Sequence, residues 1–185
     1  MEIRPVFTLD REAVRQVMGG YSSRERYAVR VLESEEQTTF QIQLEELPGL
    51  FEKDFRAGLL EDDLDRYEQM LAEGLSRAAW EGEQLVGVGL ASAERWNGTL
   101  WIWEFHVHPQ FQGRGVGRAL MESLAVAGRQ AGLRTMRVET QSSNVPAIRF
   151  YRSLGFQLQG MDVSLYTNDD LSAGEVALFF KHRLD

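Results

Sequence analysis

Residues 106–120 read His106-Val107-His108-Pro109-Gln110-Phe111-Gln112-Gly113-Arg114-Gly115-Val116-Gly117-Arg118-Ala119-Leu120, and this stretch decides the fold. An apolar run over residues 100–107 is typical of a strand, and the periodicity of residues 116–130 is typical of an amphipathic helix. Between them, alternating glycines leave the backbone bare, so that several N–H groups can converge on an anion. The helix N-terminus adds about half a positive charge at the same place. The stretch therefore predicts a strand–turn–helix unit that binds a phosphate group.

Two common phosphate-binding loops do not fit this stretch. A P-loop ends in Gly-Lys-Ser/Thr, and no lysine follows these glycines. The dinucleotide pattern G-x-G-x-x-G, counted from Gly113 or from Gly115, finds Arg118 or Leu120 where its last glycine should stand. What remains is Gln-x-x-Gly-x-Gly after a strand that ends Val-x-Pro. This resembles the acetyl-CoA pyrophosphate loop of the GNAT superfamily of N-acetyltransferases; a glycine-rich turn without a ligand is the alternative.

A second motif covers residues 138–156, Val-Glu-Thr-Gln-Ser-Ser-Asn-Val-Pro-Ala-Ile-Arg-Phe-Tyr-Arg-Ser-Leu-Gly-Phe. Asn144 is a favourable helix N-cap, and Pro146 is tolerated in the first turn, where its missing N–H is not needed. The segment is similar to the GNAT strand–Asn–helix segment, in which Asn-x-x-Ala precedes Phe-Tyr and a closing Gly-Phe. The resemblance implies that Asn144 both caps the helix and bonds the pantetheine amides of acetyl-CoA.

Composition limits the class of protein. The 185 residues, 43% of them hydrophobic, predict a single domain, residues 1–185, with a proper core. Without cysteine there is no disulfide, no thiolate nucleophile and no cysteine-based zinc site, and no metal is expected. The N-terminal residues do not resemble a signal peptide and no apolar run reaches membrane-spanning length, so a soluble cytoplasmic protein is expected.

The net charge of −8 bears on the binding partner. It argues against nucleic acid, which requires a basic face. It suits a cationic amine substrate, which a field of this sign can steer, although the acidity can equally serve solubility alone.

The order of elements predicts an α/β protein. Helices are expected over residues 10–18, 61–74, 116–130 and 145–154. Strands are expected over residues 2–7, 27–32, 38–44, 78–81, 85–93, 100–107, 136–140, 156–166 and 176–182, with a polar excursion over 167–175. The pair Asn97-Gly98 indicates a hairpin turn. The resemblance implies the GNAT fold, a mixed, mostly antiparallel central sheet of 6–7 strands flanked by about four helices, with residues 1–76 shaping the acceptor site.

Further features are similar to the streptothricin acetyltransferase branch of the superfamily. They are the stretch 138–141 leading into Asn144, the stretches 161–166 and 175–180, and four residues ahead of an acidic helix: Pro48, Phe51, Lys53 and Phe55. This resemblance implies that the acceptor is an amino group on the β-lysine part of an antibiotic.

The resemblance also implies a reaction, in which a neutral amine attacks the acetyl thioester. Tyr151 matches the tyrosine that protonates the departing thiolate, since a phenol is protonated at neutral pH; core packing is its alternative. Glu139 and Glu104 are the candidate bases, acting directly or through water, and either can instead bind the cationic substrate or form a structural ion pair. Glu104 should share a strand face with His106.

Cofactor contacts are expected from residues 105–107 and 112–118, and from Asn144 and Tyr151. The resemblance implies that backbone groups around Phe105–Val107 pair with pantetheine and stabilise the oxyanion, and that Asn144 and Tyr151 face the same arm of the cofactor. The complete set of expected cofactor-binding residues is Phe105, His106, Val107, Gln112, Gly113, Arg114, Gly115, Val116, Gly117, Arg118, Asn144 and Tyr151.

Three functions remain open. The first is acetylation of a primary amine on a small molecule, which includes a streptothricin-like antibiotic. The second is acetylation of a protein or peptide at its N-terminus or at lysine. The third is an acetyl-CoA-binding sensor without catalysis, against which Tyr151 and the two candidate bases argue. A monomer and a homodimer fit the sequence equally.

Overall fold

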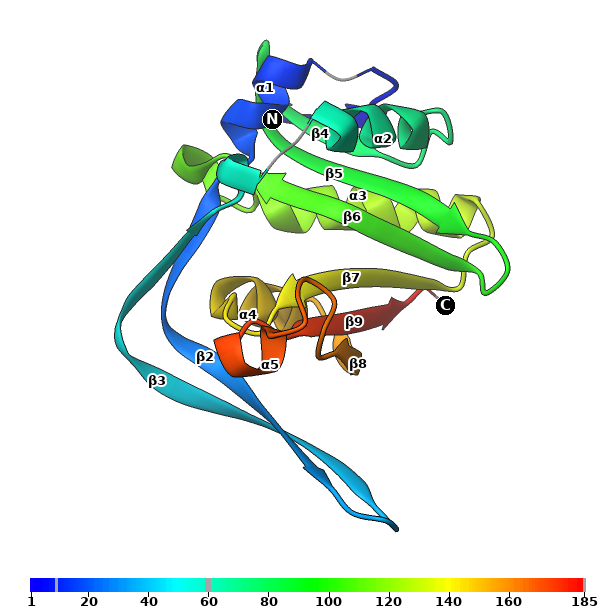
Figure 1. The fold of residues 1–185 in the computed structure, drawn as a ribbon. Helices are drawn as coiled ribbons and strands as arrows, with labels where there is room; N and C mark the ends of the chain where they lie inside the picture. The colour runs from blue at the N-terminus through cyan, green and yellow to red at the C-terminus, as the bar shows by residue number, and fades with distance from the viewer. Residues whose placement is uncertain (9, 59–60, 185) are drawn as a thin grey trace. The chain divides into compact units, whose positions relative to one another are not determined.

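The computed structural model describes residues 1–8, 10–58 and 61–184 (Figure 1). Its helices are α1 (Arg11–Val17), α2 (Glu61–Leu71), α3 (Val116–Gln130), α4 (Val145–Ser153) and α5 (Asp170–Ala173), with short 3-10 helices η1 (Phe55–Gly58) and η2 (Pro109–Phe111). Its strands are β1 (Glu2–Pro5), β2 (Gly20–Glu33), β3 (Thr38–Asp54), β4 (Arg77–Glu81), β5 (Gln84–Glu94), β6 (Thr99–Val107), β7 (Thr135–Gln141), β8 (Gln157–Asp162) and β9 (Ala177–Arg183).

The strands form a seven-stranded sheet in the order β1-β4-β5-β6-β7-β9-β8 and a two-stranded sheet, β2-β3. The β6–β7 pairing is parallel, while β1–β4, β4–β5, β5–β6 and β8–β9 are antiparallel. The predicted mixed, mostly antiparallel α/β sheet is therefore confirmed.

The chain divides into two compact units. Unit 1 contains Met1–Gly20, Asp54–Val138 and His182–Asp185, and unit 2 contains Tyr21–Lys53 and Glu139–Lys181. Each unit is thus built from stretches that are far apart in the sequence.

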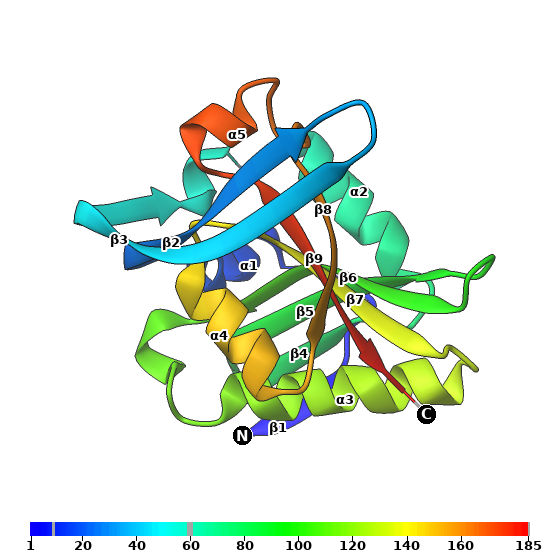
Figure 2. The same cartoon turned by 90° about the horizontal axis from the view of Figure 1, so that it is seen from below.

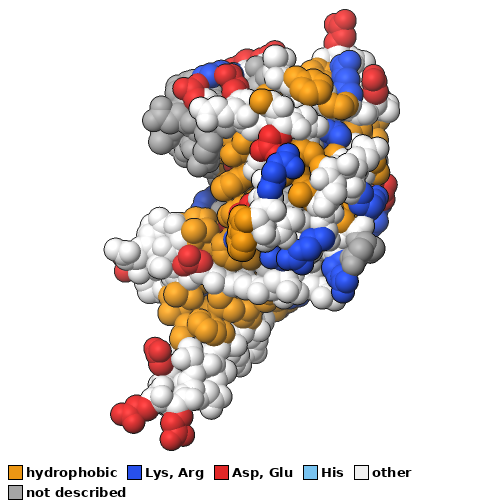
Figure 3. All heavy atoms as spheres, turned by 90° about the vertical axis from the view of Figure 1, so that its right-hand side faces the viewer, with side chains coloured by type: hydrophobic (Ala, Val, Ile, Leu, Met, Phe, Trp, Pro, Cys, Tyr) orange, Lys and Arg blue, Asp and Glu red, His pale blue; other side chains and the backbone are white. Residues whose placement is uncertain are grey.

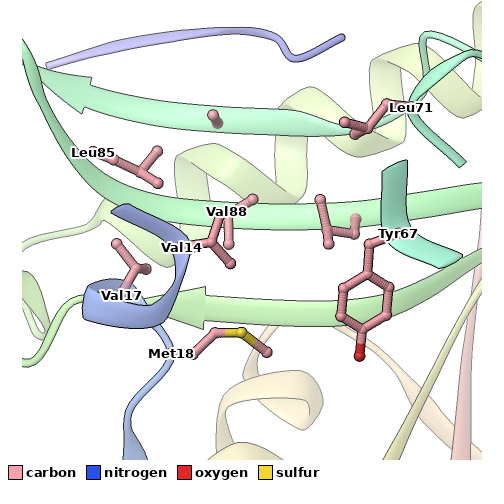
Figure 4. Packing of buried hydrophobic residues seen from close by; sticks show 9 residues of the cluster. Val14, Val17, Met18, Tyr67, Leu71, Leu85 and Val88 are labelled. Atoms are coloured by element: carbon pink, nitrogen blue, oxygen red, sulfur yellow. The ribbon is translucent and has the colours of Figure 1, made fainter. Parts of the chain in front are cut away.

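In unit 1, helices cover both faces of the strands (Figures 1 and 2). On one face α1 and α2 pack over β4 and β5 through a cluster that contains Val14, Tyr67, Leu71 and Val88 (Figure 4). Asp10 caps α1 by accepting hydrogen bonds from the N–H groups of residues 12 and 13 at 3.0 and 3.1 Å, as its position predicts.

On the other face of these strands lies α3, which begins and ends at the predicted residues. It packs unusually close to β5, because a Cβ built on Gly89 would lie 2.7 Å from Leu124 Cδ1. Gly128, one turn further, would likewise place a Cβ 2.8 Å from Leu184 Cδ1. Two glycines, one on the strand and one on the helix, therefore set how closely α3 approaches its neighbours.

In unit 2, the hairpin β2–β3 is much longer than the predicted strands 27–32 and 38–44. Its turn is closed by the Ser34 N–H, which donates to the Gln37 carbonyl at 2.8 Å. Most side chains along it are exposed or half-buried, so the two strands lack the clear alternation that marks a strand with one buried face. Pro48 does not interrupt β3, because a two-stranded sheet has free edges where a missing N–H is tolerated.

The far end of this hairpin is acidic (Figure 3). Glu33, Glu35 and Glu36 are exposed there. Large apolar side chains are also exposed along the two strands, namely Leu32, Phe40, Leu44 and Leu50.

The predicted strand over residues 156–166 is wrong beyond Asp162. The Asp162 carboxylate accepts a hydrogen bond from the Ser164 N–H at 2.9 Å, and such a local side-chain bond turns the backbone out of the ladder. The polar excursion over 167–175 contains α5, a single turn that was not predicted.

Candidate active site

The glycine-rich loop lies within unit 1, between β6 and α3. Its entry is ordered by short-range bonds: the Phe111 N–H donates to the His108 carbonyl at 2.8 Å, and Gln112 Nε2 donates to the Val107 carbonyl at 3.1 Å. Gly113 and Gly115 then adopt positive φ angles of 71° and 85°. Glycine is the residue that takes this conformation without steric cost, which explains two of the alternating glycines.

The N-terminus of α3 is open to an anion. Gly115 is the N-cap residue, and no side chain caps the helix there. The Ala119 N–H donates to the Gly115 carbonyl at 3.1 Å, and the N–H groups of the first turn ahead of it have no partner within the helix. A Cβ on Gly113 or Gly115 would meet nothing within 4 Å, so the backbone on this side is bare. A bare backbone and a helix N-terminus therefore meet at residues 112–118, the stretch predicted to bind the diphosphate of acetyl-CoA.

Arg114 lies beside the loop. Its guanidinium carbon stands 4.8 Å from the ring centroid of Phe111. This cation–π contact holds a positive charge close to the bare backbone.

Glu104 belongs to a polar network in unit 1. The Tyr67 hydroxyl donates to Glu104 Oε1, and His106 Nε2 lies 2.7 Å from Glu104 Oε2. Glu104 and His106 thus share a strand face, as predicted. Tyr67 is not among the predicted site residues, and Figure 4 shows its hydroxyl pointing away from the apolar cluster that holds its ring.

The pairing of β6 with β5 is irregular at one point. The register with β5 shifts between Leu90 and Ala91, which pair with Glu104 and Ile102. Trp103 is the extra residue of this bulge, and a bulge re-aims the side chains that follow it. Glu104 is the first of these.

The second motif lies in unit 2. Asn144 Oδ1 accepts the Ala147 N–H at 3.2 Å, so the predicted cap of α4 is confirmed. Tyr151, on the same helix, is 6% exposed and packs against the rings of Phe150, Phe156 and Phe180 at centroid distances of 5.6, 5.8 and 6.4 Å. The ring of Tyr151 is therefore part of the core. Because the ring is held by packing, the position of its hydroxyl is restricted as well.

Glu139, also in unit 2, has a partner that the sequence did not reveal. The Tyr166 hydroxyl donates to Glu139 Oε1. Burial raises the pKa of Tyr166 above its ordinary value, and the negative charge and hydrogen bond of Glu139 raise it further. Tyr166 therefore stays protonated and remains a donor. The sequence offered one indication of this contact, because Tyr166 directly precedes the polar segment 167–175. The strand predicted over residues 156–166 included Tyr166, so the contact was not expected.

Beside this pair lies a second polar cluster. Lys53 Nζ contacts both carboxylate oxygens of Glu175, at 2.8 and 2.9 Å. Ser143 donates to Glu175 Oε1 at 3.3 Å and its hydroxyl is 2.7 Å from that of Tyr21. Burial, opposed by the bond to Ser143 and aided by Glu175, raises the pKa of Tyr21. Lys53 was noted in the sequence only for its resemblance, and Tyr21 and Glu175 were given no role.

The predicted site residues therefore fall into two sets. Unit 1 holds Glu104 and the Phe105–Val107 backbone on β6, and the loop 112–118 that leads from η2 into α3. Unit 2 holds Glu139, Asn144 and Tyr151, on β7 and α4.

Over the described ranges 1–8, 10–58 and 61–184, and among the side chains that the structure describes there, no group of three or more His, Asp or Glu gathers in a way that could hold a metal ion. Over the same ranges, no helix combines the length and the apolar character required to cross a membrane.

Comparison with known proteins identifies relatives of this chain. The acetyltransferase (GNAT) family profile matches residues 37–156. The streptothricin acetyltransferase of Streptomyces lavendulae is 38% identical over 95 residues, which are 51% of this chain and 50% of that protein. The chain thus spans about half the length of the curated relatives it matches.

Two solved structures are similar over the full chain. The crystal structure of nourseothricin acetyltransferase has a TM-score of 0.76 and 28% identity, and the match covers 100% of this chain and 98% of that chain. A structure from Bacillus anthracis str. Ames in complex with acetyl coenzyme A has a TM-score of 0.75, with 100% and 97% coverage. At 21% identity, the second structure supports the fold alone.

Proposed function

The chain belongs to the acetyltransferase (GNAT) family, and we propose that it is an acetyl-CoA-dependent N-acetyltransferase acting, as one domain over residues 1–185, on a primary amine of a small molecule. The observation that carries this proposal is the bare, left-handed backbone at Gly113 and Gly115 ahead of α3. Such a loop suits a diphosphate, because its N–H groups and the helix dipole both favour negative charge.

The other cofactor contacts follow from the same arrangement. The N–H groups of residues 113–118 bind the diphosphate, with Gln112 holding the loop against Val107 and Arg114 adding charge. The backbone of Phe105–Val107 accepts pantetheine as an added strand would, and Asn144 contributes from the start of α4. Bound acetyl-CoA supplies the acetyl thioester.

The proposed chemistry uses Glu139 and Tyr151. The amine loses a proton to Glu139, directly or through one water, and its nitrogen then forms a bond to the acetyl carbon. The carbon–sulfur bond breaks as Tyr151 gives its phenolic proton to the departing thiolate. A main-chain N–H within residues 105–107 donates to the oxyanion that forms between these steps.

Glu104 is the second candidate base, and its contacts favour another role. Both of its oxygens are engaged, one by Tyr67 and the other by His106. A carboxylate held in this way links α2 to β6 and places negative charge on that strand. We therefore assign Glu104 to binding of the cationic acceptor and keep Glu139 as the base.

The acceptor we favour is a streptothricin-like antibiotic. The similarity to the Streptomyces lavendulae enzyme supports this choice, as does the similarity to nourseothricin acetyltransferase over the full chain. The net charge of −8 is compatible with a polycationic acceptor.

A thiol-release assay with acetyl-CoA tests the function. The amines are streptothricin, lysine, polyamines, aminoglycosides and short peptides, and turnover is expected with streptothricin or another small amine. Turnover only on peptides would support a protein acetylase instead, and saturable acetyl-CoA binding with no thiol release on any amine would support a sensor.

A matched pair of glycine variants tests the loop. Gly115→Ala and Gly132→Ala both place a Cβ at a positive φ, 85° and 71°, with nothing within 4 Å, and they lie at opposite ends of α3. Each should cost about 1–2 kcal/mol of stability. Only Gly115→Ala should raise the Kd for acetyl-CoA, by about tenfold or more in calorimetry. Equal Kd values for the two variants would remove the loop from the site.

A further inference from the structure

Tyr166 stands in a short connection between β8 and α5, and its hydroxyl donates to Glu139 Oε1 on β7. The tyrosine is 37% exposed, so core packing alone does not explain its placement. A phenol that donates to a carboxylate stabilises the charged form of that carboxylate and limits its rotation.

The connection is itself fixed by Asp170, the first residue of α5. Asp170 Oδ2 accepts the Tyr166 N–H at 2.8 Å, and Oδ1 accepts the Thr167 N–H and hydroxyl at 2.8 and 2.7 Å. Asp170 is 2% exposed, and its contacts hold it as a carboxylate. The backbone that carries Tyr166 is therefore held at two successive N–H groups.

The ring of Tyr166 has a further contact. Lys53 Nζ lies 5.9 Å from the ring centroid, while the same ammonium is paired with Glu175. The ring therefore lies beside an ammonium that is already paired with a carboxylate, and the hydroxyl donates to Glu139, the carboxylate that the proposed mechanism uses as its base.

We propose that Tyr166 is a positioning residue for acetyl transfer, holding Glu139 in its ionised form and in one orientation for the acceptor amine. The inference rests on the proposed function. Tyr166 gives up no proton during the reaction; it keeps Glu139 available to take one. The chain Asp170–Tyr166–Glu139 therefore connects α5 to the reacting carboxylate.

A double-mutant cycle tests this role. Tyr166→Phe removes only the hydroxyl, and kcat/KM in the thiol-release assay should fall about tenfold at pH 7, the size expected of one hydrogen bond to a charged group. The loss should be larger at pH 6, because Glu139 without its donor is protonated more easily. In the Glu139→Gln background, adding Tyr166→Phe should change kcat/KM by less than about twofold, because Tyr166 acts through Glu139.

The matched control is Tyr27→Phe. Tyr27 lies in the same unit, and its hydroxyl accepts a hydrogen bond from Arg152 Nη1 at 2.7 Å. This variant also loses one hydroxyl and should leave kcat/KM and its pH profile unchanged. Thermal unfolding of all variants shows whether each is folded.

The outcomes separate the two proposals. If the wild type turns over and the losses from Tyr166→Phe and Glu139→Gln are additive, with an unshifted pH profile, Tyr166 has only a structural role and the inference is overturned. A wild type that releases no thiol with any amine contradicts the proposed function and, with it, this inference.

Discussion

Tyr151 combines an observed packing position with a proposed chemical role. Its ring is buried among three phenylalanines, so the helix face that the core requires is the face that carries the phenol. The two roles separate only when the hydroxyl is removed and the ring is kept.

Tyr151→Phe makes that separation. We expect kcat to fall by about 100-fold or more, since general acid catalysis contributes about 10²–10⁴-fold. The Kd for acetyl-CoA should rise by no more than about tenfold, since one neutral hydrogen bond is worth about 0.5–1.5 kcal/mol. Stopped-flow thiol release and calorimetry give the two numbers. An unchanged kcat would leave Tyr151 with packing alone.

Among the elements, α3 packs closely against the sheet at one glycine. Gly89 on β5 has no room for a methyl group, because Leu124 is fully buried and its Cδ1 cannot move aside freely. A glycine on β5, which carries no predicted site residue, therefore sets the position of the helix that follows the proposed anion-binding loop.

Gly89→Ala should cost about 1–3 kcal/mol by overpacking. For a chain of this length that lowers the Tm by about 2–4 °C per kcal/mol, measurable by calorimetry. Gly49→Ala is the control, because it meets nothing within 4 Å and should stay within about 0.5 kcal/mol of the wild type. If both variants unfold at the wild-type temperature, the close approach of α3 does not constrain stability.

The segment from Tyr166 to α5 should respond to acid. Burial raises the pKa of Asp170, but the hydrogen bonds from Tyr166 and Thr167 outweigh it, so the pKa lies below the ordinary 3.8. A carboxylate with a lowered pKa stabilises the fold at pH values above 3.8, and this contribution is lost as the pH falls through the folded-state value.

Asp170→Asn should remove that part of the pH dependence. We expect its Tm to lie below that of the wild type at pH 6 and the two curves to converge below about pH 4, as Asp170 becomes neutral in the wild type. Thermal unfolding between pH 2.5 and 7 measures both curves. A gap that persists at pH 2.5 would show that the carboxylate charge is not what holds the segment.

Much of this chain could be predicted because its signals are local. The helix expected over residues 10–18, the helix over residues 116–130 and the Asn144 cap each depend on neighbours within a few residues. The hairpin was predicted too short because half-exposed strands have no buried face to impose alternation. The bonds of Tyr67 to Glu104 and of Tyr166 to Glu139 could not be predicted, since each joins positions far apart in the sequence.

The discontinuous make-up of unit 2 has a consequence for biosynthesis. The hairpin residues 21–53 leave the ribosome before their partners in 139–181. In the folded chain the Tyr27 N–H donates to the Ser142 carbonyl at 2.8 Å, and this bond cannot form until Ser142 has been synthesised. While translation covers residues 54–138, the nascent hairpin lacks this partner, and Ala28, which is buried in the finished fold, is still exposed. Such a segment invites aggregation, so slow elongation should lower the soluble yield and a holding chaperone should restore it.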